Sequence, residues 1–312
     1  YMSDPIDISI ITASYNLLKS GRKEKIIRCL ESIHAQKNVK YEHLIIDGAS
    51  TDGTLEFLSP YEKKGWIKIY SEPDKGIYDA FNKGIDKALG KYVCFINSDD
   101  YLNTPEGLSV SLNLLQQTGA DFSYSPVSYE QGGHIISTDE KRTDMRNVFY
   151  HIPGCHQGML FKKSLFGQIG LHELKFEICA DYDFILRAVL SKATSVRVPQ
   201  SYAVFSMEGL SGSNPEQLAQ ESIAIKAKNY NCSYKEAEKI HQTLYVPWKL
   251  YIKLLSCTAV DNKFSYLLWN WRHSPQRQKL KALRHWIFTL RTRKGRRALR
   301  ILGINIVSEE KR

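Results

Sequence analysis

The first hundred residues alternate short apolar runs with segments of helical periodicity. Residues 8–11 and 92–96 are runs of bulky apolar side chains of strand length, so they predict buried β-strands. Residues 24–35 instead repeat apolar side chains every three to four positions, which predicts an amphipathic helix. Further strands are predicted at residues 43–46 and 66–70. Strands that alternate with helices are typical of an α/β fold with a largely parallel sheet flanked by helices.

Each of these predicted strands ends in polar side chains. Thr12, Asp47 and Glu72 follow or close the first three strands, and Asn97 follows the fourth. In open α/β sheets, ligands bind outside the carboxyl ends of the strands. We therefore expect these four ends to line one crevice.

The pattern changes beyond residue 100. Thr104 and Pro105 predict a helix start, since a capping residue precedes a proline suited to the first turn. After Pro215 the periodicity is only helical. We therefore expect an α/β domain over residues 1–213 and a helical region over residues 214–312. Between the two helical stretches, the pattern predicts a hairpin (122–137), a strand (159–161), a helix (181–190) and an extended segment (196–205).

The charge of the chain is concentrated at one end. The 312 residues carry a formal net charge of +10, yet residues 262–308 hold twelve Lys or Arg and no Asp or Glu. The six cysteines lack paired spacing, which is typical of reduced thiols in a cytoplasmic protein. No run of 18 apolar residues is present, so no membrane-spanning helix is expected.

Asp99 and Asp100 place two adjacent carboxylates directly after a buried strand. A turn with a helix cap would explain such a pair without any function. At a strand end that faces a crevice, the pair could instead hold Mg²⁺ or Mn²⁺, which favour oxygen ligands and bridge carboxylates to phosphates.

Six segments, in this order and spacing, resemble family 2 glycosyltransferases of the GT-A fold, especially those that build bacterial O-antigen, capsular or other surface polysaccharides. The resemblance covers about residues 5–213. It implies transfer of a sugar from a nucleotide-diphosphate sugar, expected to be linked to UDP, to an acceptor hydroxyl with inversion at the anomeric carbon. The segments are ITASYN, IIDGASTDGT, SEPDKGIYDAFNKGI, YVCFINSDD, HQGMLF and ADYDFILR.

The resemblance also implies roles for individual residues toward the donor. Asp47 matches the carboxylate that accepts a hydrogen bond from uracil, and an Asx-turn with Ser50 or Thr51 is the alternative. Asn97-Ser98-Asp99 stands in place of a DxD motif, and its amide leaves Asp99 as the expected direct metal ligand, with Asp100 beside it. The donor-binding residues expected are Thr12, Ser14, Tyr15, Asn16, Asp47, Lys75, Gly76, Asp79, Asn82, Lys83, Asn97 and Ser98.

A second departure from the family pattern concerns the diphosphate. Relatives often carry an arginine at the position of Phe81, so Lys75 or Lys83 is expected to supply the missing charge, unless each is simply a solvated lysine.

On the acceptor side, Asp181 matches the general base of the family. The alternative is a helix N-cap at Asp181, with Asp183 as a first-turn charge that complements the helix dipole. His156 and Gln157 match a pair near the acceptor, and a buried structural histidine is the alternative there. Asp183 is included with these two as an acceptor-side candidate.

The basic tail has a separate explanation. Residues 276–290 place leucines and an isoleucine on one face with Lys and Arg beside them, which predicts an interfacial helix. Tyr266, Trp269 and Trp271 would suit a lipid headgroup layer. We therefore expect residues 262–308 to bind an anionic membrane at the cytoplasmic face, where a glycan or lipid-linked acceptor is presented. A helix packed on the catalytic domain or a partner subunit is the alternative.

Two other functions remain open from sequence. A sugar nucleotidyltransferase shares a nucleotide crevice with carboxylates on metal, but its first loop would be rich in glycine, and residues 11–25 contain a single glycine. The basic tail with interleaved aromatics could bind nucleic acid. No nucleic-acid partner is expected, because the N-terminal crevice is acidic where phosphates would lie.

Overall fold

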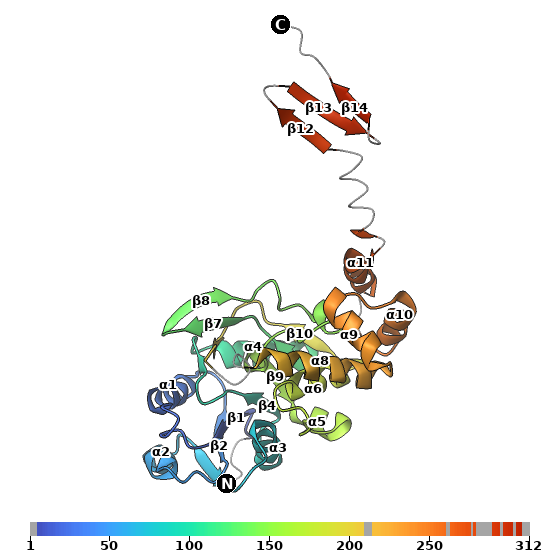
Figure 1. Ribbon diagram of the computed structural model, residues 1–312. Coiled ribbons are helices and arrows are strands. Elements are labelled where there is room, and N and C mark those ends of the chain that lie inside the picture. The colour runs from blue at the N-terminus through green and yellow to red at the C-terminus, as the bar shows by residue number, and fades with distance from the viewer. Residues whose placement is uncertain are drawn as a thin grey trace.

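The structure is a computed structural model and shows an α/β body that continues into C-terminal helices (Figure 1). It describes residues 5–208, 214–259, 263–275, 277–278, 289–293, 296–301 and 304–307.

A seven-stranded sheet forms the centre of the body, with strand order β10-β6-β9-β4-β1-β2-β3. The pairs that β1 makes with β2 and β4, and that β2 makes with β3, are parallel, whereas β9 runs antiparallel to both β4 and β6. The expectation of a mostly parallel sheet is confirmed. The strands are β1 (Ile8–Ser14), β2 (Tyr41–Asp47), β3 (Lys68–Ser71), β4 (Tyr92–Phe95), β6 (Phe122–Tyr124), β9 (Met159–Lys162) and β10 (Ser195–Arg197).

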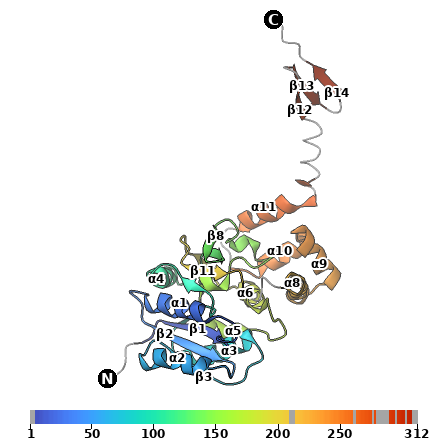
Figure 2. The ribbon, with the colours of Figure 1, turned by 60° about the vertical axis from the view of Figure 1, so that its left-hand side comes forward.

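Helices cover both faces of this sheet (Figure 2). The alternation of side chains along a strand sends Ile11 and Phe95 into one apolar cluster with α3, α5 and α6, and Ile10 and Cys94 into another with α1, α2 and α4. The central strands are therefore apolar on both faces. The helices are α1 (Lys23–His34), α2 (Thr54–Lys63), α3 (Ile77–Lys87), α4 (Gly107–Thr118), α5 (Lys163–Ile169) and α6 (Ala180–Leu190).

A four-stranded sheet, ordered β5-β11-β7-β8, lies beside the central one. Its strands are β5 (Tyr101–Leu102), β7 (Val127–Gln131), β8 (His134–Thr138) and β11 (Ala203–Ser206).

Three expectations for this part of the chain, a hairpin, an extended segment and a helix start, were only partly correct. The hairpin consists of β7 and β8 around Gly132 and Gly133, whose φ angles of 58° and 81° suit glycine. Phe122–Tyr124 pairs instead in the central sheet. The extended segment at 196–205 divides between the two sheets, and α4 begins at Gly107, two residues after Pro105.

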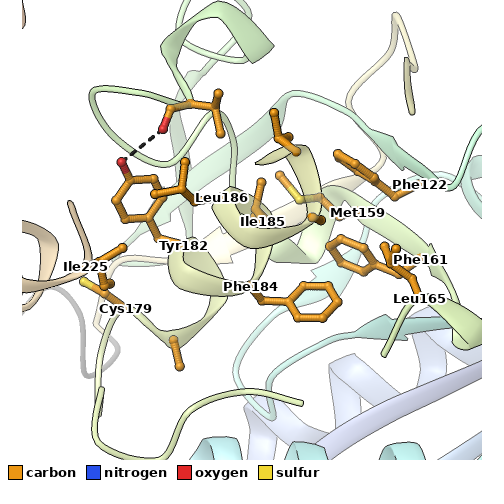
Figure 3. Packing of buried hydrophobic residues seen from close by; sticks show 14 of the residues in the cluster. Phe122, Met159, Phe161, Leu165, Cys179, Tyr182, Phe184, Ile185, Leu186 and Ile225 are labelled. Carbon is orange, nitrogen blue, oxygen red and sulfur yellow. Dashed lines mark hydrogen bonds between the residues drawn. The ribbon is translucent and has the colours of Figure 1, made fainter. Parts of the chain in front are cut away.

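Four C-terminal helices pack on the body and share its core. Tyr230 donates its hydroxyl hydrogen bond to the carbonyl of Phe149 at 2.6 Å, and Tyr150 donates to Asn270 Oδ1 at 2.9 Å. Ile225 lies in the same apolar cluster as Tyr182 of α6 (Figure 3). The chain therefore packs continuously across residue 214. The helices are α8 (Pro215–Tyr230), α9 (Tyr234–Thr243), α10 (Trp248–Ser256) and α11 (Lys263–His273).

The end of the chain differs from the all-helical expectation. β12 (Thr289–Arg293), β13 (Arg296–Ile301) and β14 (Ile304–Val307) pair antiparallel with one another. Of the helix expected at 276–290, residue 276 and residues 279–288 lie outside the described residues, and 289–290 belong to β12. Among the helices that the structure describes, none has the length and apolar character needed to cross a bilayer.

Candidate active site

The carboxyl ends of β1, β2 and β4 lie side by side, because these strands are parallel neighbours in the sheet. A cavity of about 420 Å³ opens beyond β4 and reaches α6, α8 and α9. It brings together several of the residues singled out in the sequence: Asn97, Ser98, Asp99, His156, Gln157 and Asp181.

Asp47, at the end of β2, is completely buried and held by hydroxyl groups. Its carboxylate accepts hydrogen bonds from Ser50 N (2.8 Å), Ser50 Oγ (2.5 Å), Ser71 Oγ (2.8 Å) and Ser14 Oγ (3.2 Å). The hydrogen bond from Ser50 N to the Asp47 carboxylate forms the Asx-turn that was the alternative explanation for Asp47. Asp47 thus fixes the three strand-end segments at the edge of the crevice.

Thr12 is also fully buried and lies between two strands. Its hydroxyl donates to the carbonyl of Ile96 at 2.7 Å and lies 2.9 Å from His43 Nε2. Its polar group is therefore used within the sheet.

Tyr15 and Asn16 begin the loop after β1. Tyr15 is 63% exposed. Asn16 adopts a left-handed backbone (φ 45°), and its Oδ1 accepts from Thr51 N at 2.9 Å. The loops after β1 and β2 are thereby joined, and they present the Tyr15 ring to solvent.

The start of α3 carries most of the other donor candidates. Gly76 (φ 115°) precedes the helix, Lys75 is exposed, and Asp79 accepts from the Lys75 backbone at 3.0 Å. Lys83 donates to the carbonyl of Pro73 at 2.5 Å and lies 3.7 Å from Asp79. The ammonium group of Lys83 therefore stabilises this loop.

Asn82 is directed toward the segment that precedes α6. Its amide donates to the carbonyl of His172 at 2.9 Å, and its Oδ1 accepts from His172 N at 3.0 Å. This pairing joins α3 to residue 172 and does not line the cavity.

Asn97 and Asp99 present oxygen atoms that lack partners. Asn97 Oδ1 and Asp99 Oδ2 are both buried and have no hydrogen-bond partner. The closest cation is Arg22, whose Nη2 lies 3.7 Å from Asp99 Oδ2 and which also lines the cavity. The sequence reasoning missed Arg22, because it lies in a loop far from β4 in sequence.

Asp100 has a different environment from its neighbour. Its Oδ2 accepts from Gln157 Nε2 at 2.7 Å and its Oδ1 from Ser206 N at 2.8 Å. Burial, and then the charge of Asp99, raises the pKa of Asp100 well above its ordinary value. Asp100 therefore connects β4 to the second sheet, and Gln157 serves that contact.

The oxygen atoms at the cavity could hold a metal ion only together with substrate phosphates. Among the described residues, no group of three or more His, Cys, Asp or Glu side chains is placed to hold a metal ion. Mg²⁺ and Mn²⁺ are nevertheless bound through one or two carboxylates when substrate phosphates complete the shell. The partnerless oxygens of Asp99 and Asn97 fit that arrangement.

Asp181 also lines the cavity. It lies in the first turn of α6, where Cys179 is the N-cap residue, so the alternative of Asp181 as N-cap is wrong. Its Oδ2 lies 3.0 Å from His156 Nδ1, and its Oδ1 accepts from Tyr78 OH at 3.2 Å. Burial alone would raise the pKa of Asp181, but hydrogen bonding and attraction from His156 outweigh it and lower the pKa.

The first turn of α6 is held from α8. Glu221 accepts hydrogen bonds from the backbone N–H groups of Glu177, Ile178 and Cys179, each at 2.9 Å. Downstream, the α6 side chains Tyr182 and Phe184 lie in the apolar core (Figure 3). The position of Asp181 is therefore fixed by both the core and the C-terminal region.

Asp183 lies away from the cavity. It is completely buried and accepts from Arg187 Nε (2.7 Å), Lys228 Nζ (3.0 Å) and Asn229 Nδ2 (2.9 Å). These contacts tie α6 to α8, which is a structural role.

An apolar patch on α10 and α11 consists of Trp248, Leu267, Leu268 and Trp271, and Ile252 is a further exposed apolar residue of α10. Ile252 is 57% exposed, and Leu268 and Trp271 are each 41% exposed. Lys249, Lys253 and Arg272 on the same helices are also exposed. Of the three aromatics expected at a lipid surface, only Trp271 is well exposed, because Tyr266 is buried in the core and Trp269 is half-buried.

The sheet order and the polar crevice at its strand ends define an open α/β protein, a class in which ligands bind at the carboxyl ends of the strands. The chain belongs to glycosyl transferase family 2, whose model matches residues 9–170.

Two curated relatives illustrate the similarity. A PGL/p-HBAD biosynthesis glycosyltransferase from Mycobacterium bovis is 30% identical over 177 residues, which covers 54% of this chain and 66% of the relative. The putative teichuronic acid biosynthesis glycosyltransferase TuaG of Bacillus subtilis is 32% identical over 123 residues, 39% of this chain and 46% of TuaG. The matches thus span about half to two thirds of these relatives.

Solved structures support the fold. TarS residues 1–349 from S. aureus, in complex with UDP-GlcNAc, aligns with a TM-score of 0.58 at 16% identity over 98% of this chain and 99% of that one. The mannosyltransferase PcManGT from Pyrobaculum calidifontis, in complex with GDP-Man and Mn²⁺, aligns with a TM-score of 0.58 at 16% identity over 90% of this chain and 79% of that one. These likenesses confirm the expected GT-A type of α/β fold.

Proposed function

We propose that this chain is an inverting glycosyltransferase that moves a sugar from a nucleotide-diphosphate sugar to a hydroxyl group of a glycan or lipid-linked acceptor. The observation that carries the proposal is the single cavity that both Asp99 and Asp181 line. One carboxylate has a partnerless oxygen suited to a cation, and the other is held ionised beside His156.

The donor is proposed to lie across the strand ends from Asp47 to Asp99. The segments fixed by Asp47 would hold the base and ribose, and Tyr15 offers an exposed ring for stacking. Asp99 and Asn97 would hold Mn²⁺ or Mg²⁺, which would neutralise charge on the departing diphosphate. Asp100 is not proposed as a metal ligand, because both of its oxygens are already hydrogen-bonded.

Arg22 replaces Lys75 and Lys83 as the proposed diphosphate-binding cation. Its guanidinium group lines the cavity next to Asp99, and a planar guanidinium binds phosphate oxygens in pairs. Lys83 is already bonded to the loop before α3.

Asp181 is proposed as the general base. A base opposite the leaving diphosphate removes the proton of the acceptor hydroxyl as the new bond to the anomeric carbon forms, which gives inversion. The lowered pKa keeps Asp181 ionised, and His156 and Tyr78 hold its orientation. Such a base contributes about 10²–10⁴ in rate.

The biological setting is proposed from the relatives and the surface. The names of the relatives in teichuronic acid and PGL/p-HBAD biosynthesis support surface glycan or glycolipid synthesis, and the UDP-GlcNAc complex of TarS supports a UDP-linked donor. The apolar patch with adjacent lysines on α10 supports peripheral association with the cytoplasmic face of an anionic membrane.

A donor screen tests the proposal. The protein is incubated with Mn²⁺ and a panel of UDP-, GDP- and dTDP-linked sugars, and released nucleotide is measured. We expect release from one donor class, with UDP favoured. No release and no thermal shift with any nucleotide would contradict the proposal.

A further inference from the structure

A buried lysine lies beside the same cavity, on the side away from the donor. Lys226 of α8 is 0% exposed, and its ammonium group lies 5.2 Å from the centre of the Tyr182 ring. Tyr182 directly follows Asp181 and lines the cavity. The amino group of Lys226 therefore lies against the side chain of the residue that follows the proposed base.

Lys226 has polar partners but no counter-ion within the described chain. Its Nζ donates to Ser222 O at 3.2 Å and Ser222 Oγ at 2.9 Å, and lies 3.4 Å from His241 Nδ1. Glu221, the nearest acid in sequence, is used by the backbone before α6. Burial lowers the pKa of Lys226 to about 7, as expected for an ammonium group without an opposite charge.

Two histidines complete a basic end of the cavity, which we define as His151, His241 and Lys226. His151 and His241 both line the cavity, as does Ser222. His151 uses Nδ1 to donate to the carbonyl of Ile152 at 2.8 Å, so Nε2 is an acceptor in the neutral ring and donates to an anion only when the ring is protonated. His241 accepts from Lys226 through Nδ1, so its Nε2 carries a proton that it can donate.

An ordinary core would not keep these groups. A buried lysine without a carboxylate is costly, and an apolar side chain of similar size would pack there at lower cost. Burial lowers the pKa of both His151 and His241, which favours neutral rings in the free cavity. An anion bound at this end of the cavity would favour the protonated forms of all three groups and would supply the missing counter-charge.

We propose that the basic end binds an anionic group of the acceptor, a phosphate or a carboxylate close to the hydroxyl that reacts. The acceptor hydroxyl would then lie at Asp181 while the anion contacts His151 and His241, with Lys226 behind them. Because it names an acceptor, this inference rests on the proposed function. It makes the enzyme selective for acidic glycan or phosphate-containing acceptors.

The test compares matched charged and neutral probes by ligand-observed NMR titration. Methyl β-glucuronide is compared with methyl β-glucoside, and glycerol 3-phosphate with glycerol, in the presence of UDP and Mn²⁺ to fill the donor site. The proteins are the wild type, Lys226→Met, and the control Lys239→Met, which removes an exposed lysine from α9.

In the wild type and Lys239→Met we expect one charged probe to bind about tenfold or more tightly than its neutral partner. In Lys226→Met we expect that ratio to fall to about one. The probe with the larger ratio identifies carboxylate or phosphate as the acceptor group. His241→Gln changes a residue that lines the cavity and should lower the same ratio of charged to neutral probe affinity. It is the second test variant if Lys226→Met does not fold.

A ratio near one in the wild type, or an unchanged ratio in Lys226→Met and His241→Gln, would overturn the inference. UDP affinity is measured on the same samples. If UDP binds normally while the ratio is one, only this inference fails. If none of UDP, GDP and dTDP binds, the proposed function fails, and the ratio of charged to neutral probe affinity still tests whether the basic end binds an anion.

Discussion

Two adjacent carboxylates, Asp99 and Asp100, have opposite environments. Asp100 is fully hydrogen-bonded between the two sheets, whereas Asp99 keeps a buried oxygen without a hydrogen-bond partner at the cavity. The sequence predicted a carboxylate pair at a strand end, but it could not separate the two roles. The distinction depends on Gln157 and Ser206, which are 57 and 106 residues away from Asp100 in the chain.

The first prediction concerns Asp99. We expect Asp99→Ala to lose the Mn²⁺-dependent part of UDP affinity, because it removes a buried carboxylate oxygen that, within the described residues, has no hydrogen-bond partner at the proposed cation site. Calorimetric titration with and without Mn²⁺ measures this, with the surface variant Asp86→Ala as control. Unchanged Mn²⁺ dependence in Asp99→Ala would assign Asp99 a structural role.

A second prediction concerns the stability cost of Lys226. Its pKa is about 7 in the folded protein and about 10.4 when unfolded, so between these values the unfolded chain binds more protons. The destabilisation is complete at and below pH 7 and is relieved as the pH rises toward 10. Lys226→Met should therefore raise the free energy of unfolding by up to about 5 kcal/mol near pH 7 and by little near pH 10.

Urea unfolding at several pH values measures this difference. Lys239→Met should show no comparable change, since Lys239 is exposed. A gain for Lys226→Met that does not vary with pH would mean that packing, and not the buried charge, explains it.

At the scale of elements, α6 depends on α8. The carboxylate of Glu221 accepts three backbone N–H groups that precede α6, and thereby sets the place of Asp181. Helix periodicity predicted both helices. It could not predict this contact, because a carboxylate that binds backbone groups more than 40 residues away leaves no periodic signal.

We expect Glu221→Gln to lower the free energy of unfolding by about 3 kcal/mol, because an amide presents an N–H donor to groups that need an acceptor. It should also slow donor turnover in the folded fraction. Urea unfolding and nucleotide release measure the two effects, with Glu216→Gln on the exposed first turn of α8 as control. Unchanged stability would show that water replaces the side chain.

The sequence predicted the four parallel strands and their polar ends because the segments there are short, mostly apolar and followed by polar residues. Boundaries that depend on tertiary pairing were missed. Phe122–Tyr124 was assigned to a hairpin, since local pattern does not show that β6 pairs with β9. Arg22 and Tyr78 were missed as site residues for the same reason, because each meets its carboxylate across a long stretch of chain.

At the scale of the whole molecule, the C-terminal helices extend the core and also carry an exposed apolar patch. Trp248, Leu267, Leu268 and Trp271 line a shallow apolar cavity of about 330 Å³ on α10 and α11. We therefore propose that α10, which lies before residues 262–308, also belongs to the membrane-binding surface.

We expect the protein to float with liposomes that contain phosphatidylglycerol and less with neutral phosphatidylcholine liposomes, because each near-surface Lys or Arg contributes about 1 kcal/mol on an anionic surface. Changing Lys249 and Lys253 to Glu together should reduce flotation, while the control change of Lys239 to Glu should not. Equal flotation with both lipids would contradict an electrostatic contribution. A gel shift with RNA at the same salt would favour the nucleic-acid alternative.

The claim that Asp181 removes the acceptor proton is tested most directly by the acceptor-dependent rate of nucleotide release in Asp181→Asn at saturating donor. The account predicts a rate about 10²–10⁴ lower than in the wild type, with UDP affinity retained. Release at the wild-type rate would contradict it.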